Sequence, residues 1–216
     1  FDINRYAGAW KFSAGAMAQY VKYNNNAYTR LRSEIKDSLG NIVQPAVAFR
    51  FNTAIDFFKF GFFGQVNRTL FNEQLSLSAG VRTDGNSFTE NGANLLKTIS
   101  PRVSLSYAFA PKWKLNASVG RYYKTPLYTV LGYRDAAGVL VNKDQPYLRS
   151  DHYVAGLEFL PTRVLRMTLE GFYKQYADYP VSAFNGISLA NQGGGFGILG
   201  NEEVLAVGKG ESYGME

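Results

Sequence analysis

An alternation of apolar and polar residues with a period of two recurs along this chain and limits the folds open to it. Residues 75–83 read LSLSAGVRT, in which the odd-numbered positions are apolar except for Thr83 and the even-numbered positions are Ser, Gly or Arg. Side chains of a β-strand point alternately to opposite faces. The segment is therefore predicted to be a strand with an apolar environment on one face and a polar environment on the other.

The same pattern appears in segments long enough to cross a membrane. In residues 10–20 the apolar face begins with Trp10 and ends with Tyr20. At about 3.3 Å per residue and a tilt of about 40°, such a strand covers roughly 25 Å, the height of the apolar band of an outer-membrane barrel. The strands expected from this pattern are 10–20, 56–68, 75–83, 100–109, 113–120, 151–160, 165–174 and one beginning near 209.

The connections between these segments alternate between long and short, which is typical of an outer-membrane barrel with short periplasmic turns and longer outer loops. A soluble sandwich would have shorter strands, of about 5–6 residues. The fold class expected is all-β: an antiparallel up-and-down meander of about eight long strands, part of a transmembrane outer-membrane β-barrel. The short turns are 70–73, 110–112 and 160–164, and the long loops are 24–55 (with a helix-compatible piece at 31–35), 84–97, 122–149 and 179–207.

Composition excludes several other classes of protein. The 216 residues contain no run of roughly 18 apolar residues, which argues against a transmembrane helix. Cys is absent, so neither a disulfide framework nor a thiolate metal site is expected. The net charge of +6 favours anionic partners. Because Lys and Arg are spread along the chain rather than clustered, nucleic acid is not an expected partner.

The turn at 110–112 predicts how its two flanking strands pair. Phe109 should face Trp113, and Tyr107 should face Leu115. Three aromatic rings would then gather at the short-turn end, as in the girdle of a barrel.

The turn at 160–164 gives a second prediction of this kind. Phe159 should face Leu165 on the apolar face, and Glu158 should face Arg166 on the polar face. The two opposite charges are predicted to form an ion pair at the short-turn end. The pair would fix the register, because a shift by one residue would turn both charges toward the apolar face.

Several segments together resemble the barrel of the TonB-dependent outer-membrane receptors. They are LSLSAGVRTDGNSF (75–88), SPRVSLSYAFAPKWKLNASVGRYYKTP (100–126), SDHYVAGLEF (150–159), LEGFYKQYADYPVS (169–182) and GKGESYGME (208–216). The resemblance covers most of the chain from about Phe57 onward. It implies a full barrel of about 22 strands, filled by a plug domain, driven by the TonB complex, and taking up a scarce nutrient ligand across the outer membrane of a Gram-negative bacterium.

The chain departs from the family pattern in having no plug domain, no TonB-contacting box and no final strand with a terminal aromatic. It begins at Phe1 without Met or a signal peptide and ends at Glu216 within a new alternating run. We therefore expect residues 1–216 to be a partial β-barrel domain of a longer protein. The alternative is a small structural or adhesive outer-membrane barrel of eight strands, without transport activity.

Residues expected to contact the ligand share two properties: they have the polar phase of their strands, and they lie near the long loops. They are Arg82, Asp84, Arg102, Tyr122, Lys124, His152, Lys174 and Tyr176. The ligand class stays open between iron chelates, cobalamin, glycans and peptides. The other expected partners are outer-membrane lipid and lipopolysaccharide, together with the TonB complex and the plug domain of the full-length protein.

No catalytic residues, cofactor or metal site are expected, and the chain is not expected to be an enzyme. His152, the only His, has no neighbours with metal-ligand spacing. We interpret it as a residue on the water-filled inner wall of the barrel. The alternative is that His152 contacts a metal or a siderophore. The glycine-rich segment 193–197 neither follows a buried strand nor opens a helix, as a phosphate-binding loop would.

Two further expectations concern the apolar face. If this face meets lipid, an Arg placed at Leu77 or Leu105 would lie in hydrocarbon. Lys22 and Arg121 lie just beyond the apolar residues of their strands, where they could reach the phosphates of lipopolysaccharide. The alternative for these two residues is ordinary solvated charge.

Overall fold

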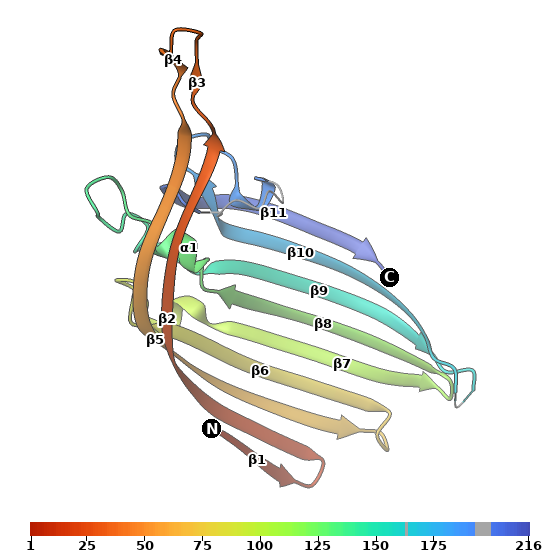
Figure 1. Ribbon diagram of the computed structural model, residues 1–216. Coiled ribbons are helices and arrows are strands. Elements are labelled where there is room, and N and C mark those ends of the chain that lie inside the picture. Colours follow the sequence, from red (N-terminus) through yellow and green to blue (C-terminus); the bar gives the residue numbers. More distant parts are fainter. Residues whose placement is uncertain (163, 193–199) are drawn as a thin grey trace.

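A computed structural model describes residues 1–162, 164–192 and 200–216, without the side chains of residues 29, 31, 49 and 50. Within these residues, nine strands form one antiparallel sheet in which neighbours along the chain pair with each other (Figure 1). The strands of this sheet, in spatial order, are β1 (Asp2–Ala7), β2 (Trp10–Arg32), β5 (Val47–Leu70), β6 (Leu75–Asn86), β7 (Ser100–Ala110), β8 (Trp113–Lys124), β9 (Leu148–Phe159), β10 (Met167–Ser182) and β11 (Val204–Met215). The predicted all-β meander is confirmed, and β1 is a strand that the sequence pattern did not predict.

The alternating sequence gives the sheet two different faces. We call inner the face on which a short loop helix, α1 (Tyr128–Leu131), packs against Val21 and Phe57, and outer the opposite face. The outer face carries exposed apolar side chains such as Leu77 and Val103. Among the described residues, no helix has the length and apolar character needed to cross a membrane.

The segment 24–55 is not the loop that the sequence predicted. β2 continues to Arg32 and β5 begins at Val47, and the two pair continuously from Trp10 opposite Arg68 to Arg30 opposite Ala48. The expected helical piece at 31–35 is also wrong, because this stretch ends β2 and enters a small hairpin. That hairpin pairs β3 (Ile35–Lys36) with β4 (Ile42–Gln44) at the tip of the arm that rises above the rest of the sheet (Figure 1).

The predicted alternation of short and long connections is confirmed. Short turns join β1 to β2, β5 to β6, β7 to β8 and β9 to β10, and all the longer connections leave from the other end of the strands. In the turn between β5 and β6, Phe71, Asn72 and Glu73 all have positive φ, at 54°, 49° and 69°. We call these two ends of the sheet the turn end and the loop end.

The predicted pairing across the β7–β8 turn is correct in the body of the strands and wrong next to the turn. Tyr107 faces Leu115 as expected. A register shift then places Ala110, not Phe109, opposite Trp113. The Trp113 ring stacks instead on Phe159 of β9, with ring centroids 4.3 Å apart.

Across the β9–β10 turn, the predicted register is wrong by two residues, yet the predicted ion pair forms. Met167 faces Phe159 and Thr168 faces Glu158. Arg166 lies just before β10, and its Nη2 reaches Glu158 Oε2 at 2.7 Å. Lys114 of β8 lies directly opposite Glu158 and approaches it at 3.7 Å. The turn is longer than predicted, but the Arg side chain is long enough to close the pair diagonally.

Candidate functional site

The candidate site is a row of side chains on the inner face, near the loop end of the sheet. Strand pairing places Gly80, Arg102, Gly120, His152 and Lys174 opposite one another on five consecutive strands, β6 to β10. The next row toward the loop end includes Arg82 and Tyr122. Six of the eight residues predicted from the sequence therefore lie in or beside one continuous patch, namely Arg82, Asp84, Arg102, Tyr122, His152 and Lys174.

Three of these residues form a stack. The Arg102 guanidinium lies over the Tyr122 ring at 4.3 Å from its centroid, and the Tyr122 ring lies 4.5 Å from the His152 ring. A Cβ atom at Gly120 would approach both Arg102 Cγ and Tyr122 Cε2 to 3.1 Å, so glycine leaves the room that the stack needs. A cation held over an aromatic face is attracted by the ring quadrupole. The stack fixes a positive group against the inner wall.

Lys174 extends this positive patch onto β10. It faces His152 across the β9–β10 pair, and its Nζ lies 4.7 Å from the centroid of the Phe172 ring. No ion pair of Lys174 or Arg102 with a carboxylate is found among the described residues. Two cations without a carboxylate partner on one wall attract an anionic group.

Arg82 and Asp84 neutralise each other. The Arg82 side chain donates two hydrogen bonds to the Asp84 carboxylate, at 2.7 Å from Nε and 2.6 Å from Nη2. Gly61 on β5 lies opposite Asp84, and a Cβ there would come within 2.5 Å of Asp84 Oδ1. The close approach of the carboxylate therefore requires glycine at this position, and the pair shapes the wall rather than adding net charge.

The two remaining predicted residues lie at the rim. Lys124 is exposed at the end of β8, opposite Leu148. Tyr176 lies opposite Ser150, and its ring packs edge-on against Tyr179 with centroids 6.0 Å apart. Neither is brought into the stack by the fold.

His152 is held by its neighbours as a wall residue. Its Nε2 lies 2.7 Å from Ser150 Oγ, and its ring belongs to the Tyr122 stack. In the part of the chain that the structure describes, no group of three or more His, Asp or Glu residues is placed to hold a metal ion. The glycine-rich segment 193–197 lies outside the described residues.

The sequence did not predict that the long loops pack together on the inner side of the sheet at its loop end. We call this packed structure, which begins with the loop 125–147, the ledge. Helix α1 places Leu131 against Val21, Ile55 and Phe57 of β2 and β5, so that these side chains are buried at the loop end. Thr53 Oγ1 donates to Gly132 O at 2.6 Å. The loop 125–147, which leaves β8, is thus fixed against the β2–β5 pair on the inner side of the sheet.

Asn142 joins this ledge to the loop before β11. The residue is fully buried. Its Nδ2 donates to Val130 O at 3.1 Å and to Glu202 O at 2.7 Å, and its Oδ1 accepts from Val204 N at 3.0 Å. Because Val130 also packs with Leu189 and Val204, one amide side chain and one apolar cluster hold two loops together.

The loop 87–99 is tied to the same structure by Tyr147. Asn86 Nδ2 donates to the Tyr147 hydroxyl at 3.0 Å, and Glu90 N donates to Asp144 Oδ1 at 3.2 Å. Burial raises the pKa of the Tyr147 phenol. Three of the long connections therefore pack together into one rim, which lies over the positive wall formed by Arg102, Tyr122, His152 and Lys174.

Comparison with known proteins agrees with this architecture. The chain matches the model of the family described as TonB dependent receptor-like, beta-barrel, over residues 1–216. No curated protein matches the sequence.

Solved structures with the same fold include three from two organisms. The siderophore receptor PirA from Pseudomonas aeruginosa is 15% identical with a TM-score of 0.62, and covers 99% of this chain and 34% of its own. PirA from Acinetobacter baumannii is 17% identical with a TM-score of 0.64, over 99% of this chain and 32% of its own. A mutant of the ferric enterobactin receptor PfeA from Pseudomonas aeruginosa is 18% identical with a TM-score of 0.64, over 99% and 31%. The chain thus spans about a third of the length of each.

Proposed function

Because this chain belongs to the TonB-dependent receptor family, as part of its β-barrel domain in the Gram-negative outer membrane, we propose that it is one wall of a receptor that takes up a scarce nutrient. The observation that carries the proposal is the positive wall of Arg102, Tyr122, His152 and Lys174 beneath the packed loops. In this assignment the inner face lines the lumen, and the loop end faces the outside of the cell.

The ligand that this wall fits best is an anionic metal chelate. Arg102 and Lys174 supply positive charge, and the Tyr122 ring supplies a flat surface beside them. Among proteins of similar fold, PirA is a siderophore receptor and PfeA is a ferric enterobactin receptor, which supports an iron chelate as the first ligand to test. Lys124 and Tyr176 at the rim, and the Arg82–Asp84 pair, belong to the same proposal as outer contacts.

The remaining parts of the receptor lie outside this chain in the proposal. β1 and β11 are the two margins of the sheet (Figure 1), and further strands of the full-length protein would pair with them to close the barrel. A plug domain would fill the lumen, and the TonB complex would drive uptake. A small closed barrel of eight strands is not favoured, because the described sheet has nine strands and no pairing between its margins.

The test uses the full-length receptor. Arg102→Gln and Lys174→Gln, alone and together, should weaken the binding of ferric siderophores measured by titration calorimetry, by about fivefold for each lost charge. Lys11→Gln is the matched control, because Lys11 lies on the inner-face phase of β2 at the turn end. Growth on a ferric siderophore as sole iron source should fall in the double variant. Equal binding by the double variant and the control would reject the anionic chelate, and uptake of a glycan, peptide or cobalamin instead would reassign the ligand.

A further inference from the structure

A feature that nutrient uptake does not use is a strand edge on the arm formed by β2 and β5. β5 pairs with β2 from Val47 to Arg68, but with β6 only from Lys59 onward. In the part of the chain that the structure describes, residues 47–58 of β5 therefore have a paired strand on one side only (Figure 1). We call the unpaired side of residues 48–56 the arm edge.

The hydrogen bonds at Phe58 show which backbone groups point to the arm edge. Phe58 O accepts from Ser87 N at 2.9 Å, and Phe58 N donates to Ser87 Oγ at 3.0 Å. Backbone groups of successive residues in a strand point to opposite neighbours. The N–H and C=O groups of the even-numbered residues of β5 therefore point away from β2. Those of Ala48, Asn52 and Ala54 have no hydrogen-bond partner among the described residues.

The strands that would complete the barrel do not cover this edge. They would pair with β1 and β11, which are the margins of the described sheet. The arm edge lies on the β6 side of β5, and β6 is already paired with β5 below it. Proteins commonly protect an exposed strand edge with Lys, Pro or a bulge. Residues 47–55 read VAFRFNTAI, with no Lys or Pro, so this edge is suited to accept another strand.

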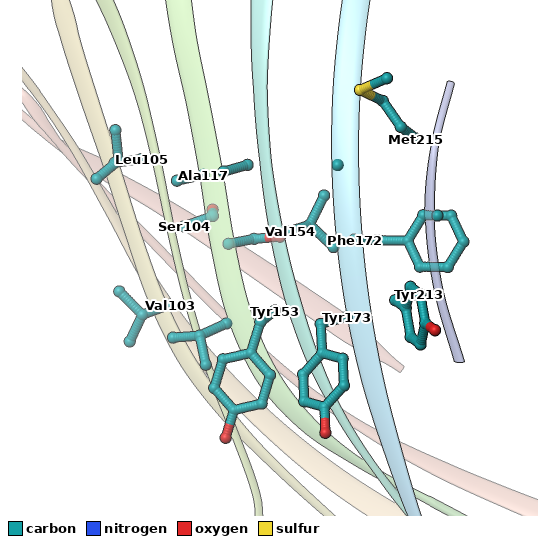
Figure 2. A pocket seen from close by; sticks show the side chains of 15 residues that line it. Val103, Ser104, Leu105, Ala117, Tyr153, Val154, Phe172, Tyr173, Tyr213 and Met215 are labelled. Atoms are coloured by element: carbon teal, nitrogen blue, oxygen red, sulfur yellow. The ribbon is translucent and has the colours of Figure 1, made fainter. Parts of the chain in front are cut away.

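The outer face of the arm differs from the outer face of the strands below it. On β7 to β11 the outer face forms an apolar groove of about 880 Å³, in which Figure 2 shows the rings of Tyr153 and Tyr173 side by side. On the arm, the same face carries the exposed polar residues Asn24, Asn26 and Arg30. The arm therefore stands above the apolar band, and a partner reaches its edge from the water outside the cell.

The arm carries a net positive charge. Residues 24–55 contain four Lys or Arg and two Asp or Glu. Lys36 pairs with Glu34 at 3.1 Å. Arg30 and Arg32 are exposed, and neither has an ion pair among the described residues. These two cations attract an anionic partner.

Arg30 lies within reach of a strand added at the arm edge. It is opposite Ala48, whose side chain is small and lies on the same face. Because neighbouring strands are about 4.8 Å apart, an added strand would lie about 10 Å from β2, within the combined reach of a Glu and an Arg side chain. Arg121, another cation on the outer face, is less available, because it donates two hydrogen bonds to Asp151, at 2.6 and 3.0 Å.

We propose that the arm edge binds an extended acidic segment of a protein outside the cell, which adds to β5 as a further strand. The backbone of the segment would bond the N–H and C=O groups of Ala48, Asn52 and Ala54, and its acidic side chains would lie against Arg30 and Arg32. In strand addition of this kind, the backbone supplies affinity and the side chains supply specificity. The inference uses the orientation of the barrel, but it is independent of the nutrient that the lumen takes up.

Synthetic peptides test the proposal on the full-length wild-type receptor. The probe is a fluorescent peptide of alternating Glu and Val, about ten residues long to match the arm edge. One twin has Lys in place of Glu, and a second twin keeps Glu but has an N-methylated backbone that lacks N–H donors. Fluorescence anisotropy should show that each twin binds at least about tenfold more weakly than the probe.

A proline at the arm edge tests the backbone contacts from the side of the receptor. Ala54→Pro removes an N–H that points away from β2, so the β2–β5 ladder keeps its bonds, and proline is accepted on edge strands. It should weaken binding of the Glu–Val probe by at least about tenfold. Ala54→Gly is the matched control, because it changes the same position and keeps the N–H.

Removing the cations tests the side-chain contacts. Arg30→Gln together with Arg32→Gln should weaken binding of the probe on the order of 20-fold, about fivefold for each charge. Arg134→Gln is the control for a general loss of surface charge, because Arg134 is exposed on a loop at the same end of the sheet. Circular dichroism of each variant establishes that the barrel is folded.

Four outcomes would overturn the proposal. They are no binding of the Glu–Val probe, equal binding of the probe and its N-methylated twin, equal binding by Ala54→Pro and Ala54→Gly, and a wild-type dimer that Ala54→Pro separates. Equal binding of the N-methylated twin would assign the arm to polyanions in general, including acidic polysaccharides, and the dimer would assign the edge to a second receptor. If Ala54→Pro does not fold, the peptide twins decide the outcome, because they leave the arm unchanged.

Discussion

The turn end and the loop end of the sheet are held together in different ways. At the turn end, Glu158 is contacted by Arg166 and Lys114, whose side chains are 64% and 43% exposed. At the loop end, Asn142 is fully buried and bonds backbone groups of Val130, twelve residues before it, and Glu202, sixty residues after it.

This difference separates two tasks within one sheet. The Glu158 side chain is only 10% exposed, but both of its cationic partners stay in contact with water. Ion pairs with solvated partners are individually weak, so the turn end does little more than bias how neighbouring strands pair. Buried hydrogen bonds depend on one another, because losing one partner leaves the other unsatisfied away from water. The loop end therefore fixes how the long loops pack on one another.

The largest expected effect comes from a substitution midway between the turn end and the loop end, which should destabilise the sheet at both ends. Leu105→Arg or Leu77→Arg places a charge on the lipid face near the midplane of the bilayer and should cost about 2–4 kcal/mol of unfolding free energy. Ser104→Arg, one residue away on the inner face, is the control and should cost much less. The measurement is denaturant unfolding of the full-length receptor in lipid vesicles. Equal costs at Leu105 and Ser104 would contradict the assignment of the faces.

The next effect should be confined to the loop end. Asn142→Leu removes the partners of Glu202 O and Val204 N, and the lost hydrogen bonds should destabilise the ledge by about 2–3 kcal/mol. Hydrogen exchange should become faster at the backbone amides of residues 128–133 and 204–206, and stay unchanged around Glu158. Asn116→Leu, on the inner face nearer the turn end, is the control. Faster exchange throughout the sheet would show that the ends are not independent.

A smaller effect is expected at the turn end. Glu158→Gln removes the charge that Arg166 and Lys114 share, and should lower the unfolding free energy by at most about 1 kcal/mol, because both cations remain well solvated. Glu170→Gln, an exposed carboxylate on β10, serves as the control. A loss as large as that of Asn142→Leu would remove the distinction between the two ends.

The smallest effect is a pH dependence at the tip of the β2–β5 arm. The Asp37 carboxylate accepts hydrogen bonds from Asn41 Nδ2, Asn41 N and Leu39 N, which lower its pKa below the ordinary value. The ionised form is therefore favoured in the folded hairpin, and its contribution is present at neutral pH and lost as the pH falls through the lowered pKa. NMR of the tip should show β3–β4 opening under acid, whereas Asp37→Ala should be open at every pH. A tip that stays closed in acid would contradict this role of Asp37.

A strand could be predicted from the sequence wherever its two faces meet surroundings that differ from each other, one apolar and one polar. Leu75–Asn86 and Ser100–Ala110 alternate because one side is apolar and the other polar. The upper part of β2 could not be predicted in this way. Asn24, Asn25 and Asn26 stand above the apolar band, where both faces of the ribbon are polar, and only the pairing with β5 makes them a strand.

The candidate site was predictable to the extent that it follows strand phase. Arg102 and His152 have the inner-face phase, and pairing across β7, β8 and β9 brings them to Tyr122. The ledge was not predictable, because α1 is four residues long and shows no helical period. Asn142 looks like any loop asparagine in the sequence, and its importance comes only from partners far away along the chain.

The arm formed by β2 and β5 also has a mechanical consequence. Above the rim, its two strands are supported mainly by their own ladder, and its tip carries Leu39, which is 86% exposed. At the base, Val21 and Ile55 are clamped under Leu131, with Thr53 bonded to the loop. The arm is thus held at its base by the ledge and extends from there to an exposed tip. A load applied to the tip would therefore be transmitted as torque to α1, which packs against the base of the arm.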